Sequence, residues 1–402
     1  MQPGNSPASR RNKPRASFVD LRVSDLLKCR LFILCVLVFG AGILTPRALA
    51  QQTPDFTQAE AMLALLRSCA ANKASPQDLD RVVALPGTDL VVAQQNISRR
   101  VSMEQYRGVL QAACAGKIAL VKPAETGTRA ERGVEGLTQD VAPSLIWGQE
   151  NLPLLESRLS DLRRNHSIGD ALPLARKYLP EPIPLEAKFY VVMGGRAGAA
   201  AIENQLYFDV LSNSWRASLG KSPPTSPAEV VEFFAHEAHH LGYGQILDRQ
   251  RASLQLTPAE NQAWGFLTGI LMEGSATFLI NGHEQMTDVQ KMPEFPTYLA
   301  KVPELLPAMQ DVLRRALAGP MSEEDYDRAV SAFLGMGYHA AGATVLSVIH
   351  EKRGLKGVME VMADPRRLLT TYNDCLPPSA GFRFDPQLAG RLAGMGKHIE
   401  TR

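Results

Sequence analysis

Residues 226–242 read SPAEVVEFFAHEAHHLG, and this stretch decides most of the fold and chemistry that the sequence predicts. Serine before proline is a common helix start, because the serine side chain accepts hydrogen bonds from N–H groups that the first turn leaves free, and proline fits that turn. The residues that follow are strongly apolar, so most of this helix should be buried. The sequence therefore predicts a helix that begins after Ser226 and includes residues 228–242.

This helix contains the pattern His-Glu-x-x-His, formed by His236, Glu237 and His240. Histidines four residues apart lie one turn above each other on one helix face, so both imidazoles can reach one zinc ion. Glu237 would then lie beside the open coordination position, where a carboxylate can take a proton from water. Because His239 has a spacing that leaves Glu237 less well placed, we expect it to have an outer role or none. The alternative is a polar patch on a surface helix.

Two glutamates compete for the third zinc ligand that a catalytic site usually has. Glu260 lies 20 residues after His240, but it also completes a capping box with Thr257, in which it would satisfy backbone N–H groups at a helix start. Glu273 is the only ionisable residue in positions 263–280, and a carboxylate in an apolar helix needs a partner or a metal. The two are 13 residues apart, about 220° around one helix, so both cannot serve. We expect Glu273 to be the ligand.

The rest of the chain is predicted to be mostly helical, with one small sheet. Residues 55–179 have near-helical apolar spacing, interrupted by turn signals, and carry little chemistry. The β-rich segments 188–193 and 206–211 flank a glycine-rich turn and predict two strands. The sequence therefore predicts an α+β fold, with a helical N-terminal region over residues 51–180 and the chemistry-bearing region over residues 181–402.

The first fifty residues have the pattern of an export signal. Seven basic residues precede the uncharged apolar run 31–44, and Ala48-Leu49-Ala50 forms a small-residue cleavage site. The run has 14 residues, fewer than the ~20 that cross a bilayer as a helix, although an uncleaved membrane anchor is the alternative. We expect a signal peptide over residues 1–50, a periplasmic or secreted mature chain, and no stable membrane association after cleavage.

Net charge and cysteine content change once this leader is set aside. The whole chain has a formal charge of +2, but residues 51–402 hold 35 basic and 39 acidic residues, a net of −4. Such a chain lacks the clustered cations that bind nucleic acid, so we exclude a nucleic-acid partner. Export permits disulfides, and Cys69 and Cys114 can pair and leave Cys375 free. The alternative is three buried thiols.

Several of these features resemble the gluzincin-type metallopeptidases, in particular bacterial families of zinc-dependent peptidases within domains of unknown function. The resemblance covers roughly residues 185–375. It rests on the strand 206–211, the HExxH motif at 236–240, the pair Glu273-Gly274 and the helix start Gly337-Tyr338-His339-Ala340-Ala341-Gly342.

The resemblance implies a zincin-like fold with a small sheet beside the active-site helix. It implies that His236, His240 and Glu273 bind Zn2+ and that Glu237 is the general base. Peptide hydrolysis also needs a hydrogen-bond donor for the oxyanion, and Tyr338, between glycines at a helix start, is our candidate. The strand 206–211 is expected to pair with an extended peptide substrate by β-augmentation, as in the enzymes that it resembles.

The leading interpretation is an exported zinc hydrolase, a metalloprotease acting on a peptide or protein substrate, in which Glu237 activates water for attack on the peptide bond. A second interpretation keeps the zinc without catalysis, as an exported binding module or a degenerate peptidase, but such a site does not need Glu237. A third is a metal-free helical interaction domain. It requires a basic partner for Glu273, and the helical segment around Glu273 offers none.

Overall fold

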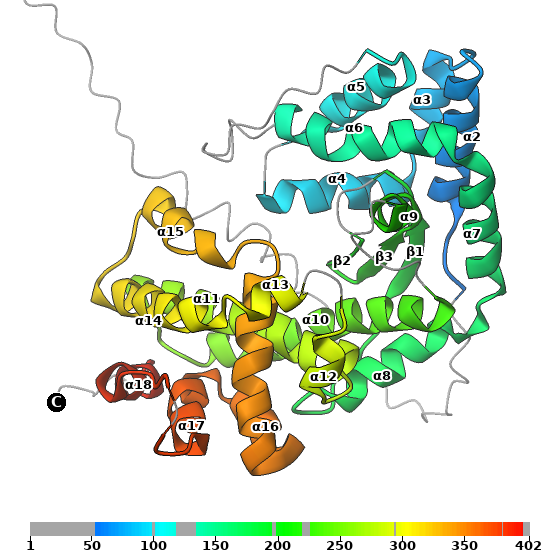
Figure 1. The fold of residues 1–402 in the computed structure, drawn as a ribbon. Helices are drawn as coiled ribbons and strands as arrows, with labels where there is room; N and C mark the ends of the chain where they lie inside the picture. The colour runs from blue at the N-terminus through cyan, green and yellow to red at the C-terminus, as the bar shows by residue number, and fades with distance from the viewer. Residues whose placement is uncertain are drawn as a thin grey trace, which may run out of the picture. The chain divides into compact units, whose positions relative to one another are not determined.

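The computed structural model describes residues 53–98, 101–117, 134–194, 198–218, 226–292, 295–379 and 381–396. In this part of the chain most residues are helical, and the strands form one three-stranded sheet (Figure 1). The expected helix-rich composition with a small sheet is confirmed. Residues 51–402 form one compact unit. The leader lies outside the described residues, so its cleavage stays a prediction, as does the boundary at residue 180.

Helices precede the sheet along the chain. Ser75 and Ser102 each cap a helix through a capping box, in which the serine and the third helical residue satisfy each other's backbone N–H groups. Cys69 and Cys114 form the predicted disulfide, and Cys375 is a free, buried thiol. The elements are α2 (Thr57–Ala70), α3 (Pro76–Val83), α4 (Pro86–Ser98), α5 (Met103–Cys114), α6 (Val134–Glu150), α7 (Leu152–Arg164), the 3₁₀ turn η1 (His166–Asp170) and α8 (Ala171–Lys177).

The sheet has the spatial order β1-β3-β2, with β3 parallel to β1 and antiparallel to β2. The predicted segment 188–193 contains β1, and the predicted segment 206–211 overlaps β3, which begins one residue earlier and ends where the chain turns into a helix at Val210. β2 was not predicted, because three of its four residues are alanine, which gives little strand signal. The elements are β1 (Lys188–Val192), β2 (Ala199–Ile202), β3 (Gln205–Asp209) and α9 (Val210–Ser218).

The predicted pairing of strand 206–211 with a substrate is wrong. β3 lies between β1 and β2, so both of its edges already form backbone hydrogen bonds. On the outer side of β1, Asp55 bonds to the backbone of Phe189 and Val191. Among the described residues, no strand pairs with the outer edge of β2.

The predicted zinc-motif helix is α10 (Pro227–Ala252), and it begins where the sequence indicates. Ser226 and Glu229 form a capping box at its start. One face of the helix packs on the sheet, with the ring of Phe234 5.0 Å from that of Phe189 and 6.3 Å from that of Phe208. This packing fixes the position of the residues one turn further on, which include the zinc motif.

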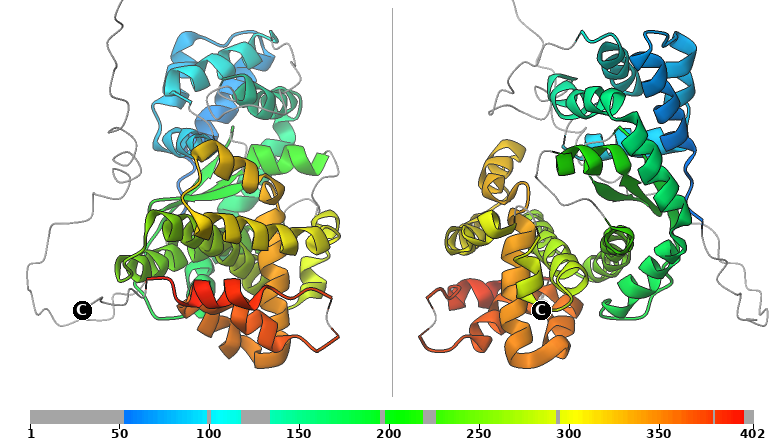
Figure 2. Two further views of the ribbon diagram at one scale, coloured as in Figure 1. Left: turned by 90° about the vertical axis from the view of Figure 1, so that its left-hand side faces the viewer. Right: turned by 45° about the vertical axis from the view of Figure 1, so that its right-hand side comes forward.

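Two later helices complete the framework of the site. α11 (Pro258–Ser275) continues into the π-helix η2 (Ala276–Asn281), and α16 (Gly337–Ala363) packs across α11 (Figure 2). Gly274 and Gly342 meet at this crossing, where a Cβ on Gly342 would lie 2.6 Å from the Cα of Gly274. Residues 258–281 are long and apolar enough to cross a membrane, but 78% of this stretch's apolar window is buried inside the protein, as in a core helix.

The remaining elements surround these two helices. They are α12 (Met286–Val289), α13 (Phe295–Leu299), α14 (Val302–Ala318), α15 (Glu323–Ala329), η3 (Ser331–Phe333), η4 (Pro365–Arg367), α17 (Leu368–Cys375) and α18 (Pro386–Ala393).

Candidate metal centre

Two imidazoles on α10 form one side of the candidate centre. His236 and His240 lie one turn apart, with ring centroids 4.5 Å apart in an edge-to-face arrangement. Their side chains are only 12% and 14% exposed. The sequence motif is therefore a pair of largely buried imidazoles on one helix face.

Glu273 on α11 lies opposite these imidazoles. Its Oε2 atom is 3.1 Å from Nε2 of His240 and 3.7 Å from Nε2 of His236. Two ligand atoms at the usual distance from a tetrahedral zinc are about 3.4 Å apart. The separations therefore suit ligands of one ion. Glu260 lies at the other end of α11, where it forms the predicted capping box with Thr257.

A third imidazole comes from α16. Nδ1 of His339 is 3.3 Å from Oε2 of Glu273 and 2.9 Å from Oγ1 of Thr277, which lies on η2. The ring of Phe295 packs edge-on against the His339 ring. Sequence reasoning gave this histidine no role. The feature of the sequence that could have indicated His339 is the pair of glycines at the helix crossing. Gly274 and Gly342 bring α11 and α16 close together beside the centre.

Tyr338, the predicted oxyanion donor, has its ring among other aromatic side chains. Its ring packs against the rings of Phe266 and Phe333, with centroids 5.7 and 5.5 Å away. It also fills the space beside Gly269, where an added Cβ would lie 3.2 Å from its ring. Burial in this apolar cluster raises the pKa of Tyr338 well above its usual value. His339 thus contacts Glu273 directly, whereas the ring contacts of its neighbour Tyr338 are with phenylalanines.

Asn281, the last residue of η2, orients His236. Its Oδ1 atom is 2.6 Å from Nδ1 of His236. An amide oxygen only accepts hydrogen bonds, so Nδ1 carries the proton and Nε2 presents its lone pair on the side of Glu273. Such support of a metal-binding histidine fixes both its ring orientation and its tautomer. Sequence spacing could not reveal this contact, because it depends on the wider turn of a π-helix.

Glu237 lies in the same group of side chains. A carboxylate oxygen of Glu237 and ring nitrogens of His236 and His240 lie within 4.8 Å of one another. Burial raises the pKa of Glu237, although the nearby charges of His240 and His236 and a bond from the backbone of Ala201 oppose this shift. Ala201 belongs to β2, so Glu237 lies between the histidine pair and the edge strand.

The electrostatics of the cluster favour an ionised Glu273. Burial alone would raise its pKa, but the imidazoles in their protonated forms hold it well below its usual range, His240 and His339 through their charges and His236 and His240 through hydrogen bonds. Burial likewise opposes the charged form of His240, yet the charge and hydrogen bond of Glu273 raise its pKa to about 9. For His339 burial prevails over the charge of Glu273, and its pKa falls to about 4.

His239 lies outside the cluster, in agreement with the expectation for it. It is fully buried, and its ring lies 5.7 Å from that of Tyr243. Burial lowers its pKa to about 3. Among the described residues, the groups of side chains that could hold a metal do not include His239.

The residues of the cluster fit a zinc ion. Imidazole nitrogens and a carboxylate oxygen are common zinc ligands, and the tautomer of His236 leaves Nε2 available. The carboxylate of Glu273 faces three imidazoles and, in the described part of the chain, pairs with no lysine or arginine. A bound cation would compensate the charge of this partly buried carboxylate. The residues that could hold zinc are His236, Glu273 and His339, whose ligand atoms lie within 4.8 Å of one another, and His240, which is 3.1 Å from Glu273.

Comparison with known proteins identifies the family. No curated protein and no solved structure is significantly similar to the chain. The model of one protein family, described as "Putative zinc dependent peptidase (DUF5700)", matches residues 148–376, which include the sheet and every side chain of the cluster. This agrees with the resemblance to zinc-dependent peptidases and with zinc as the cofactor. Because the match covers more than half of the 402 residues, the chain belongs to this family.

Proposed function

We propose that the protein is an exported zinc metallopeptidase with a zincin-like active site. One observation carries the proposal: a single carboxylate oxygen of Glu273 lies within 4.0 Å of ring nitrogens of His236, His240 and His339. A second carboxylate, that of Glu237, lies beside the same histidines. A site that only binds zinc has no need of this second carboxylate.

In this proposal His236, His240 and Glu273 hold the zinc. Zinc supplies Lewis acidity, which polarises a carbonyl group and makes water more acidic. Three protein ligands leave one position open, as a catalytic site requires. Asn281 keeps His236 in the tautomer that a ligand needs, through the 2.6 Å contact at Nδ1.

Glu237 acts as the general base. Its carboxylate takes a proton from the attacking water and then delivers that proton to the leaving amide nitrogen. The role is supported by its position between the histidine pair and β2, because a substrate beside β2 would lie within its reach.

We assign the role of oxyanion donor to His339 instead of Tyr338. The ring of Tyr338 is held among phenylalanines, whereas the ring of His339 reaches the cluster. A fourth protein ligand would close the open position of the metal, so His339 is better suited to donate a hydrogen bond to the substrate. Its contact with Thr277 keeps the imidazole at the edge of the cluster.

The outer edge of β2 is the proposed place for the peptide backbone. An extended peptide can add to a free strand edge and obtain main-chain hydrogen bonds without sequence preference. Since Ala201 bonds to Glu237, a peptide residue opposite Ala201 would lie next to the general base. This replaces the pairing with strand 206–211.

The test combines metal analysis with a cleavage assay on the mature chain from residue 51, purified without a histidine tag. We expect about one zinc per chain by mass spectrometry. Glu237→Gln should keep the zinc and abolish cleavage of a peptide library. Glu273→Gln should lose zinc, whereas Glu260→Gln, the matched change on the same helix, should retain it.

Absence of zinc after titration would overturn the proposal, and so would full cleavage by Glu237→Gln. A protein that holds zinc but cleaves no peptide would favour the non-catalytic binding module. Export is tested separately by expressing the full chain in a Gram-negative host. Recovery of a periplasmic protein that begins at Gln51 supports the signal peptide, and recovery of the uncleaved chain in the membrane contradicts it.

A further inference from the structure

Two consecutive residues just after the π-helix η2 have a left-handed backbone. His283 and Glu284 have φ angles of 49° and 65°, and neither is a glycine. This conformation is costly for a residue with a Cβ, so it persists only where surrounding contacts hold it. The other non-glycine residues with positive φ in the described part of the chain, Asn72 and Glu203, occur singly. The contacts of His283 and Glu284 therefore fix the conformation of this turn.

The backbone of the turn closes the end of η2. The N–H of Glu284 donates to the carbonyl oxygen of Phe278 at 2.9 Å, and the N–H of Gly282 donates to that of Thr277 at 2.8 Å. The last carbonyl groups of a helix need such donors. Asn281, whose amide oxygen contacts the zinc-motif helix α10, immediately precedes these two donors. The conformation of the turn thus determines how Asn281 faces α10.

The carboxylate of Glu284 is bound from two other helices. Its Oε1 atom accepts a hydrogen bond from the hydroxyl of Tyr178, at the C-terminal end of α8, at 2.9 Å. Its Oε2 atom is 3.3 Å from Nε2 of His350 on α16. The ammonium group of Lys177 lies 3.7 Å from Oε1. Because only 23% of the Glu284 side chain is exposed, these contacts connect the end of η2 firmly to α8 and α16.

His283 connects the same turn to α10. Its Nε2 atom is 3.2 Å from a carboxylate oxygen of Glu232. Glu232 precedes His236 by four residues and so lies one turn before it on the same face of α10. Asn281 and His283 therefore contact α10 at positions one helical turn apart. The side chain of His283 is 55% exposed, and such a contact contributes little, so the enclosed Glu284 is the stronger anchor of the turn.

We propose that Glu284 is a positioning residue of the zinc site. By anchoring the left-handed turn to α8 and α16, it holds the end of η2 so that Asn281 stays bound to Nδ1 of His236. The proposal rests on the zinc site of the proposed function and does not depend on peptide cleavage. Loss of the anchor lets the turn relax, so that His236 loses its orienting partner and zinc binding weakens.

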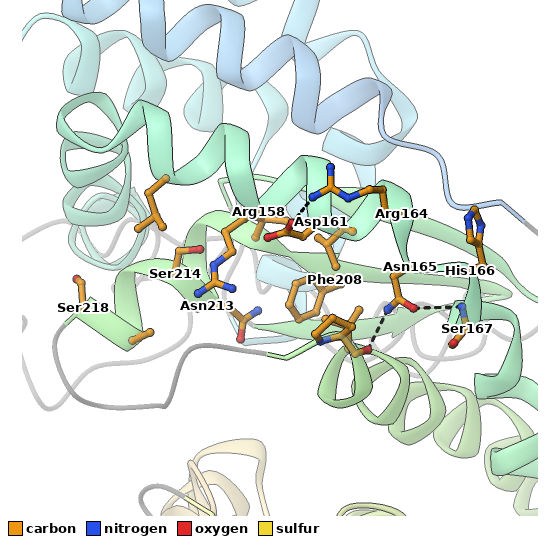
Figure 3. A pocket seen from close by; sticks show the side chains of 16 residues that line it. Arg158, Asp161, Arg164, Asn165, His166, Ser167, Phe208, Asn213, Ser214 and Ser218 are labelled. Atoms are coloured by element: carbon orange, nitrogen blue, oxygen red, sulfur yellow. Dashed lines mark hydrogen bonds and ion pairs between the residues drawn. The ribbon is translucent and has the colours of Figure 1, made fainter.

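The start of α10 receives a hydrogen bond that does not involve this turn. Pro227 and Val230 of α10 line a pocket of about 710 Å³, together with residues of α7, α9 and β3 (Figure 3). Beside this pocket, Asn165 donates a hydrogen bond to the carbonyl oxygen of Pro227 at 2.9 Å. This contact holds the same helix as Asn281 does, but from a segment that carries no part of the site. It therefore offers a comparison for the effect of Glu284.

The test compares two glutamates that share a left-handed backbone. Glu284→Gly removes the anchoring carboxylate but suits the positive φ, so a loss reflects the missing contacts and not a strained backbone. We expect the zinc affinity, measured by competition with a chelator, to fall about tenfold or more. The matched control is Glu203→Gly, because Glu203 has a φ of 54° and is exposed on the turn between β2 and β3. Both Glu203→Gly and Asn165→Ala should leave the zinc affinity unchanged.

A double-mutant cycle shows whether Glu284 acts through Asn281. If it does, Glu284→Gly should have little further effect on the zinc affinity of a protein that already carries Asn281→Ala. A fall of the same size in both backgrounds would overturn the positioning role. If Glu284→Gly does not fold by circular dichroism, Tyr178→Phe replaces it, because this change removes the 2.9 Å hydrogen bond and leaves the carboxylate in place.

A measurement on the zinc-free protein separates this proposal from the proposed function. The nitrogen chemical shifts of His236, assigned by their absence in His236→Ala, report which ring nitrogen carries the proton. The wild type should carry it on Nδ1, and Glu284→Gly should show a mixture of both tautomers. An unchanged tautomer with unchanged zinc affinity in Glu284→Gly would overturn the anchor and leave the zinc site standing. A wild type that binds no zinc, with a tautomer that Glu284→Gly alters, would support the anchor and contradict the proposed function.

Discussion

Gly342→Ala should impair catalysis without removing zinc. A Cβ at this position would meet the carbonyl oxygen of Ile270 and lie 2.6 Å from the Cα of Gly274. Carbon atoms need about 3.5 Å or more, so α11 and α16 must separate by about 1 Å. The Oε2–Nδ1 distance between Glu273 and His339 is now 3.3 Å and would grow by a similar amount.

Two magnitudes follow from this displacement. Inserting a methyl group into a tightly packed contact costs about 1–3 kcal/mol, measured as a lower free energy of unfolding in a denaturant titration. A misplacement of about 1 Å of a catalytic group costs on the order of a hundredfold in kcat/KM. Zinc should remain, because His236, His240 and Glu273 lie on α10 and α11, not on α16.

The control is Gly265→Ala on α11, the helix that Gly342 contacts, where a Cβ would meet nothing within 4 Å. It should stabilise the helix by up to about 1 kcal/mol and leave activity unchanged. Wild-type stability and activity for Gly342→Ala would refute the claim that the glycine contact sets the helix spacing. Loss of zinc from Gly342→Ala would instead indicate that His339 is a metal ligand.

Three further predictions follow from contacts within the same unit. Asn281→Ala should weaken zinc binding about 10–100-fold, measured by competition with a chelator, because His236 loses its orienting partner; unchanged affinity would count against that role. His339→Ala should keep zinc and lower kcat about 100-fold or more, while Tyr338→Phe stays near wild type; the reverse pattern would restore the tyrosine as donor. Replacing Cys69 and Cys114 by serine removes a disulfide that joins residues 45 positions apart, and it should lower the free energy of unfolding by about 4 kcal/mol. An unchanged denaturation midpoint would contradict this stabilising role of the disulfide.

The sequence predicted the parts of the site whose geometry is local. His236, Glu237 and His240 share one helix, so a spacing of four residues is enough to place them together. Glu273 was chosen because it is the single ionisable residue in the apolar stretch 263–280, where a carboxylate is costly without a polar partner or a metal. The choice of Glu273 over Glu260 agrees with the capping box that the structure has at Thr257.

The parts that were missed depend on how distant elements meet. His339 and Tyr338 are adjacent in sequence, and only the packing of α16 on α11 decides which of them reaches the cluster. β2 carries no strand signal of its own and forms because β3 offers it an edge. Local propensity cannot report on either case, since tertiary contacts determine them.

The π-helix η2 makes the site sensitive to the number of residues between Glu273 and Asn281. Glu273 and Asn281 are eight residues apart and would be about 80° apart around a regular α-helix. The wider turn reduces this rotation, so that both residues reach His236, Glu273 near Nε2 and Asn281 at Nδ1. Removing any one residue between them would turn Asn281 away by a quarter of a circle. Within this family, residues 275–280 should therefore tolerate exchanges of side chains far better than insertions or deletions.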